Sequence, residues 1–137
     1  MECIHCGNLT RVTNSRSSKS SFSIWRRRQC QSCKEIFTTT EAPDLKASIV
    51  VKNIDGTLEP FSPDKVFMSI LYSCNHRKSP LDDARALTNT FTKRMMHHIN
   101  TGIIEKTIIQ KICSDILMNF DIASHTYYNA YYVRKKN

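Results

Sequence analysis

Four cysteines arranged as two identical pairs carry the clearest chemistry in the sequence. Cys3 and Cys6 form one Cys-x-x-Cys pair and Cys30 and Cys33 form another, with 23 residues between the pairs. Two such pairs supply four thiolates for tetrahedral ligation of one ion, and zinc binds sulfur without a redox change. Four protein ligands leave no open position for a reacting water. The spacing predicts one structural Zn²⁺ ion, with an iron–sulfur centre or a redox dithiol as the alternative.

The other two cysteines and three of the histidines are also possible metal ligands, but none is expected to bind the ion. His5 lies inside the first pair, but four thiolates already complete the shell, so we expect it beside the site or at the surface. Cys74 and Cys113 fall on apolar helix faces and are expected in the core. The adjacent His97 and His98 point in different directions on a helix and make poor joint ligands.

A run of three arginines directly precedes the second cysteine pair. Metal ligation would fix the backbone there, and guanidinium groups on a rigid scaffold suit phosphate contacts and can read guanine edges. The predicted contacts to double-stranded DNA share one basic face: Arg11, Arg16, Arg26, Arg27 and Arg28. A solvated charge run is the alternative. The neighbouring Trp25 is expected to pack in a small core instead of stacking on a base.

The charge distribution also favours a polyanionic partner for the N-terminal part. The net charge is +8, of which residues 1–40 contribute +5 and residues 41–137 contribute +3. The first residues lack the basic-then-apolar pattern of a secretory signal, and no stretch approaches the ~20 apolar residues of a membrane span. We expect a cytoplasmic, nucleoid-associated protein with no membrane partner.

These residues need elements to position them, and the pattern predicts two domains, residues 1–45 and 46–137. In the first, the serine-rich residues 15–21 indicate an exposed loop and residues 36–40 a strand. The second begins with a hairpin, in which residues 49–51 and 58–61 flank a turn at Asp55-Gly56.

Four helices follow the hairpin. Ser62-Pro63 and Ser79-Pro80 are typical helix starts, each with an acidic first turn. Apolar spacing predicts a third helix over about 103–119, and Asp121 can cap a fourth that carries the tyrosines. The predicted fold class is α+β: a small β domain with a metal, then a hairpin or small sheet with a four-helix bundle.

Motifs across most of the chain resemble the NrdR repressors of ribonucleotide reductase genes. In residues 1–41 they are the cysteine pairs, Val12-x-x-Ser15-Arg16, Arg26-Arg27-Arg28 and Phe37-Thr38-Thr39-x-Glu41. In the second part they are Val50-Val51-Lys52, Asp55-Gly56, Glu59-Pro60-Phe61 and Lys65. The first set is similar to a zinc ribbon and the second to an ATP-cone, a small module that binds ATP or dATP.

The resemblance implies a repressor in which ATP and dATP act as allosteric ligands. Their binding to the cone would change the homo-oligomer, and the zinc ribbons would then engage or leave paired operator boxes. The residues implied for the nucleotide are Val51, Lys52, Glu59, Lys65, Tyr131 and Lys135. The chain departs from the family at Trp25, which replaces a fourth arginine, and in the hairpin, which is one residue longer.

Three other functions stay open at this point. A detached cone regulator that binds ribonucleotide reductase protein directly would leave the arginines without a role. An enzyme acting on ATP is disfavoured because the sequence has no Gly-rich phosphate loop and no set of acids arranged for Mg²⁺. A zinc-ribbon protein–protein adaptor is the third. We therefore expect a regulator and no catalytic residue.

Overall fold

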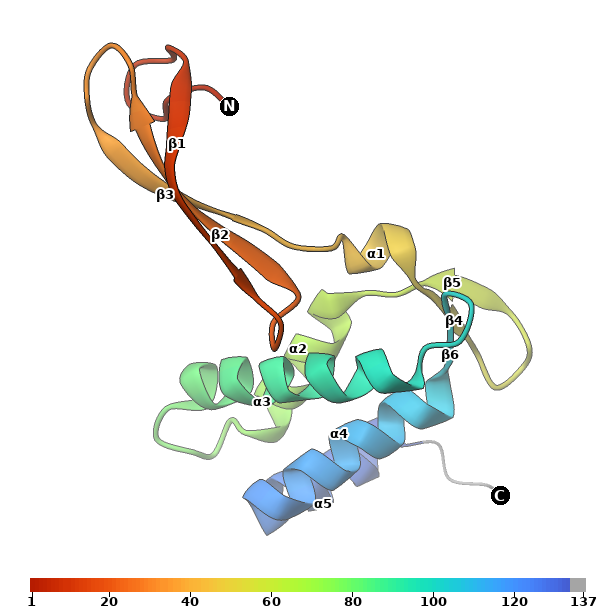
Figure 1. Cartoon of the computed structure of the whole chain (residues 1–137). Coiled ribbons are helices and arrows are strands. Elements are labelled where there is room, and N and C mark those ends of the chain that lie inside the picture. The colour runs from red at the N-terminus through yellow and green to blue at the C-terminus, as the bar shows by residue number, and fades with distance from the viewer. Residues whose placement is uncertain (134–137) are drawn as a thin grey trace. The chain divides into compact units, whose positions relative to one another are not determined.

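The computed structural model describes residues 1–133. The chain divides into two compact units, Met1–Pro43 and Asp44–Asn137 (Figure 1). The elements confirm the α+β class: strands occupy the first unit, and the second combines a small sheet with helices. Within residues 1–133 no helix is both long enough and apolar enough to cross a bilayer.

The first unit is a three-stranded antiparallel sheet in the order β1-β2-β3 (Figure 1). Its strands are β1 (Thr10–Ser18), β2 (Ser23–Cys30) and β3 (Ile36–Glu41). The loop predicted over residues 15–21 is wrong for its first half, because residues 15–18 pair with β2. The side chains of β1 are mostly exposed, so serine residues are tolerated there. Pairing with β2 satisfies the backbone hydrogen bonds of these residues.

This unit has no apolar core within the described residues. Its buried residues are Cys3 and Cys30. Trp25 is only half-buried and carries the Arg16 guanidinium 6.0 Å from its ring centroid, which corrects the expectation that Trp25 packs in a small core. A unit of this size with so little buried apolar surface needs another source of stability.

The second unit contains a mixed three-stranded sheet in the order β5-β4-β6. After the short helix α1 (Leu45–Ser48), the strands are β4 (Val50–Lys52), β5 (Leu58–Pro60) and β6 (Ile103–Glu105). The predicted hairpin is β4 and β5, whereas β6 pairs in parallel with β4. The predicted helix start at residue 103 is wrong because Ile104 is buried as a strand residue, 1% exposed.

Four longer helices complete this unit: α2 (Pro63–Ser73), α3 (Pro80–Met95), α4 (Lys106–Phe120) and α5 (Ile122–Tyr132). A 3-10 turn, η1 (Met96–His98), follows α3. The Ser62 hydroxyl caps α2 by accepting from the Lys65 amide at 3.3 Å, but Ser79 makes no side-chain cap bond at α3.

The core of the second unit lies among the sheet and the four helices. Phe61 at the end of the hairpin stacks on Phe91 of α3, with ring centroids 6.3 Å apart. Cys74 and Cys113 are fully buried in this core, as predicted. Burial of these side chains holds the sheet and the helices in fixed positions, and two cavities lie between these elements.

Candidate functional site

The two cysteine pairs meet at one end of the first unit. All four sulfurs lie within 4.8 Å of one another. Cys3 Sγ is 3.7 Å from Cys33 Sγ, and Cys6 Sγ is 3.5 Å from Cys30 Sγ. A tetrahedral zinc with Zn–S bonds of about 2.3 Å requires sulfurs about 3.8 Å apart. The donor set and its spacing therefore fit a tetrahedral zinc ion. His5 lies outside this cluster, with its ring edge against Phe37.

Each cysteine pair sits in a turn of the same design. The Cys3 amide donates to the Asn8 carbonyl at 2.8 Å, and the Cys30 amide donates to the Glu35 carbonyl at 2.9 Å. A residue with positive φ follows each pair: Gly7 at 76° and Lys34 at 65°. These turns aim backbone amides at the sulfurs, as hydrogen bonds that favour thiolates do.

The hydrogen bonds act unequally on the thiol pKa values. The Asn8 backbone and side-chain amides lower the pKa of Cys6 to about 6. At Cys33 the Glu35 amide also lowers the pKa, but burial and the neighbouring sulfurs outweigh it and raise that pKa to about 12. Four crowded sulfurs resist losing all their protons unless a cation neutralises them.

The five predicted DNA-contact arginines lie on β1 and β2 but not on one face. Arg27 shares a face with Arg11 and Arg16, whereas Arg26 and Arg28 lie on the opposite face, because successive strand residues alternate. We call these the Arg27 face (Arg11, Arg16 and Arg27) and the Arg28 face (Arg26 and Arg28). The expectation of a single basic face is therefore corrected.

Two adjoining cavities lie beside the small sheet of the second unit. The first, of about 520 Å³, is bordered by residues from β4, β5, α2, α4 and α5, and the second, of about 580 Å³, by residues of the hairpin turn, α4 and α5. Both include Glu59, Lys65, Lys106, Gln110 and Tyr131. Their size is that of a typical small-molecule site.

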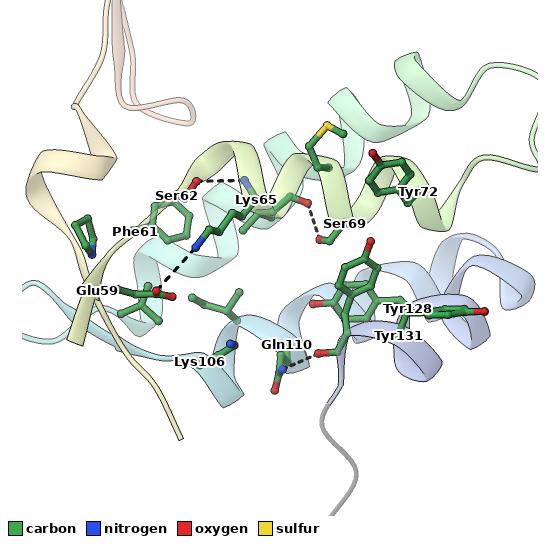
Figure 2. Close-up of a pocket in the computed structure, with 16 residues that line it drawn as sticks. Glu59, Phe61, Ser62, Lys65, Ser69, Tyr72, Lys106, Gln110, Tyr128 and Tyr131 are labelled. Carbon is green, nitrogen blue, oxygen red and sulfur yellow. Dashed lines mark hydrogen bonds and ion pairs between the residues drawn. The ribbon is translucent and has the colours of Figure 1, made fainter. Parts of the chain in front are cut away.

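Charged and aromatic side chains occupy different ends of the first cavity. Figure 2 shows Glu59, Lys65 and Lys106 at one end and Tyr72, Tyr128 and Tyr131 at the other. Lys65 Nζ lies 3.8 Å from Glu59 Oε2, an exposed ion pair that holds neither group strongly. An anionic group therefore fits one end and a flat apolar group the other.

The structure places the predicted nucleotide residues in different positions. Val51, Glu59, Lys65 and Tyr131 border the first cavity. Lys52 borders a smaller hollow of about 220 Å³, which shares Asn53 and Ile54 with the second cavity. Lys135 lies outside the described residues.

Sequence reasoning missed two residues of both cavities, Lys106 and Gln110. Gln110 Nε2 donates to the Tyr132 carbonyl at 2.7 Å and so ties α4 to the end of α5 (Figure 2). Lys106 is the first residue of α4, where a cation opposes the helix dipole. A lysine at the first position of a helix is unusual and could have marked Lys106 as a candidate functional residue. Lys106 was not expected at that position, because the apolar spacing predicted that the helix begins three residues earlier.

Comparison with known proteins agrees with both units. Residues 1–41 match the family described as Transcriptional repressor NrdR-like, N-terminal domain, and residues 49–136 match the ATP cone domain. A Halalkalibacterium halodurans protein named Transcriptional repressor NrdR is 32% identical over 138 residues, which cover 100% of this chain and 89% of the relative. The chain belongs to the NrdR family of transcriptional repressors.

Other NrdR relatives show similar agreement over different lengths. A Desulforapulum autotrophicum NrdR is 31% identical over 96% of this chain and 79% of the relative. A Thermus thermophilus NrdR is 42% identical over 66% of this chain, and that match spans 60% of the relative's length. All three carry the name of a transcriptional repressor, so the family is one of regulators and not of enzymes.

Proposed function

We propose that this protein is a transcriptional repressor whose zinc ribbon binds operator DNA upstream of ribonucleotide reductase genes under the control of ATP and dATP. The observation that supports this most directly is the sulfur cluster in the first unit, which fits zinc and sits at the end of an arginine-bearing sheet. The second unit adds a cavity with an anion-binding end and an aromatic end.

The zinc ion stabilises the first unit in this proposal. Cys3, Cys6, Cys30 and Cys33 bind it, and the two turns hold the sulfurs at distances that fit tetrahedral ligation. Zinc binding can supply ~10 kcal/mol or more of folding free energy, which replaces the missing apolar core. The fixed sheet then presents its arginines to double-stranded DNA with little loss of conformational entropy.

The cavities of the second unit bind the adenine nucleotide. Lys65 and Lys106 contact the phosphates, with Lys52 reaching them from the hollow that adjoins the second cavity. Tyr131, which is 72% exposed, provides a flat face for the base, and Val51 borders the same cavity. Glu59 lies 3.8 Å from Lys65 in a weak, exposed ion pair, so the phosphates can replace Glu59 as the partner of Lys65.

Nucleotide binding controls DNA binding through assembly of the protein. A ligand shifts an assembly equilibrium only by binding one assembly more tightly than another. One ribbon offers few contacts, and two ribbons held together gain effective concentration on paired operator boxes. In this proposal the ATP-cone senses the nucleotide and the zinc ribbon contacts the DNA.

The second candidate function is direct regulation of ribonucleotide reductase protein by the cone. It accounts for the cavities but gives no role to the arginines of β1 and β2. Duplex binding by the intact chain separates the two functions.

The test uses zinc-loaded protein and a labelled duplex from the region upstream of a ribonucleotide reductase gene in the same genome, with unlabelled mixed-sequence DNA as competitor. Wild-type protein is expected to retain the labelled duplex, and the triple variant Arg26/Arg27/Arg28→Ala to lose it while keeping its zinc. Equal binding by both proteins, or no binding by either with any nucleotide, contradicts the proposal.

A further inference from the structure

The positions of two arginines on β1 depend on one extra residue in that strand. Arg11 and Arg16 are five residues apart, and regular alternation would place their side chains on opposite faces. The pairing with β2 shifts between Val12 and Asn14, so Thr13 has no partner. This β-bulge reverses the alternation beyond it.

The register with β2 shows the result. Arg11 lies opposite Gln29, and Arg16 lies opposite Trp25. Residues opposite each other on antiparallel strands share a face, and Trp25, Arg27 and Gln29 are spaced by two. Without the bulge, Arg16 would lie on the Arg28 face.

A hydrogen bond holds the bulge in place. The Thr13 hydroxyl donates to the Arg27 carbonyl at 3.2 Å. Thr13 decides to which face the following side chains of β1 point. The hydrogen bond therefore links Thr13 directly to Arg27, the β2 arginine on the same face as Arg11 and Arg16. Bulges commonly re-aim side chains in this way.

Within residues 1–133, no acidic side chain forms an ion pair with the arginines of the Arg27 face. Arg11 donates to the Gln29 amide oxygen at 3.0 Å, and Arg16 lies over the Trp25 ring. Both contacts orient a guanidinium without cancelling its charge. Arg27 is exposed and forms no side-chain hydrogen bond or ion pair within residues 1–133.

The Arg28 face differs. Arg26 is paired with Glu41, and Arg28 Nε donates to the Thr39 hydroxyl at 3.1 Å. Both side chains thereby link β2 to β3. The other two acids of the first unit, Glu2 and Glu35, lie outside the three strands, so no strand position on the Arg27 face is acidic.

We infer that the Arg27 face, assembled by the bulge at Thr13, lies against the phosphate backbone of duplex DNA, and that the Arg28 face stabilises the sheet. The inference rests on the proposed DNA binding and adds its surface. β3 contributes Thr38 and Thr40, which pair with Arg27 and Trp25 and are suitable donors to phosphate oxygens. Three unneutralised guanidinium groups on one face are complementary to a polyanion.

The first experiment compares Arg27→Gln with Arg28→Gln in the zinc-loaded full chain. The two variants lose the same charge at adjacent positions of one strand. The probe is a labelled mixed-sequence duplex, and the readout is the slope of log K against log salt concentration. Arg27→Gln is expected to reduce the steepness of the slope by up to about 0.9, the value for one lost phosphate contact, and Arg28→Gln to leave it near the wild-type value.

An equal loss of slope in the two variants overturns the assignment of the face. The failure of the wild-type chain to bind any duplex instead overturns the proposed function. Zinc content and the far-ultraviolet circular dichroism spectrum of each variant establish that the ribbon is folded.

The second experiment tests the bulge by deleting Thr13. The deletion removes the unpartnered residue and leaves Arg11 and Arg16 four residues apart, so a regular ladder keeps both on the Arg27 face. Adding Arg16→Gln is therefore expected to change the slope by the same amount in the wild-type and deletion backgrounds. An effect of Arg16→Gln that disappears in the deletion background contradicts the assignment of Thr13 as the extra residue of the bulge. If the deletion variant loses zinc, Thr13→Ala is tested in its place, because it removes the hydroxyl that bonds the Arg27 carbonyl. Thr13→Ala is expected to lower the affinity for the duplex. Wild-type affinity would contradict the inference.

Discussion

Cys30 shows how much of the ribbon depends on single side chains. It is 1% exposed, and its sulfur accepts from the amides of Ser32 at 3.3 Å and Cys33 at 3.4 Å. Its burial among sulfurs and amides leaves no apolar partner to stabilise the turn without metal. We therefore expect the fold of the ribbon to depend on a bound metal, as is usual for small domains without a core.

Cys30→Ser is expected to reduce the zinc content from about one ion per chain to near zero, because three thiolates no longer close the shell. The ribbon should then become sensitive to protease while the second unit keeps its helices. Elemental analysis and limited proteolysis measure the two effects. Cys74→Ala is the control, since Cys74 lies in the other unit's core and its loss should leave the zinc bound. A full complement of zinc in Cys30→Ser would refute the ligand set.

Two lysines of the cavities give a second prediction at this scale. Lys65→Ala and Lys106→Ala are each expected to weaken ATP binding about tenfold or more, the effect of losing one charge-assisted hydrogen bond. Titration calorimetry measures the affinity. Lys78→Ala serves as control because Lys78 is exposed and borders neither cavity. Unchanged affinity in both cavity variants would exclude this site.

The cysteines were predictable from spacing alone, because the ligand pattern is local in sequence. The orientation of the arginines was not. Adjacent residues of β2 necessarily point to opposite faces, but the phase of β1 depends on a bulge that only the pairing of the strands defines. Lys106 was missed for a related reason, since the start of α4 depends on β6 joining β4.

Among the elements, α2 and α3 begin with the same Ser-Pro pair but are capped differently. The Ser62 hydroxyl accepts from the Lys65 amide, whereas Ser79 makes no such bond. The sequence predicts two equal starts. The difference arises from the backbone at the cap, which is extended at Ser62 but not at Ser79.

Ser62→Ala is therefore expected to destabilise the second unit by about 1 kcal/mol, the usual cost of a lost N-cap. Ser79→Ala is the matched control and should cost clearly less. Urea unfolding followed by circular dichroism measures both. Equal destabilisation by the two substitutions would contradict the capping assignment.

The start of α5 is also tied to the connection between α2 and α3. Asp121 Oδ2 accepts from the Ser124 hydroxyl at 2.7 Å and lies 2.8 Å from His76 Nε2. The hydrogen bond from Ser124, helped by His76, outweighs partial burial and lowers the pKa of Asp121. Because the folded pKa lies below the unfolded value, the carboxylate stabilises the fold at neutral pH. This contribution is lost as the pH falls through the folded pKa.

Asp121→Asn should therefore destabilise the second unit at neutral pH, with the difference from wild type shrinking below about pH 4, where the unfolded carboxyl protonates. Asparagine caps helices about as well as aspartate, so the substitution isolates the charge. Unfolding free energies at several pH values test this. A difference that stays constant down to strongly acidic pH would show that the charge is not responsible.

At the scale of the whole molecule, one chain combines an NrdR-type N-terminal domain with an ATP cone domain. The family motifs were recognisable from the sequence because they are short and local. The mixed sheet was not, since β4 and β6 are about fifty residues apart in the chain and pair only in the folded unit. The cavities form beside that sheet and could be found only with the structure.

Native mass spectrometry of the purified full chain, with and without ATP and dATP, tests the central claim most directly, because a single spectrum reports metal, ligand and assembly. We predict one zinc ion per chain in every state, bound nucleotide when it is added, and different oligomers with the two nucleotides. A folded chain without metal, or a distribution of oligomers that neither nucleotide changes, would contradict the account.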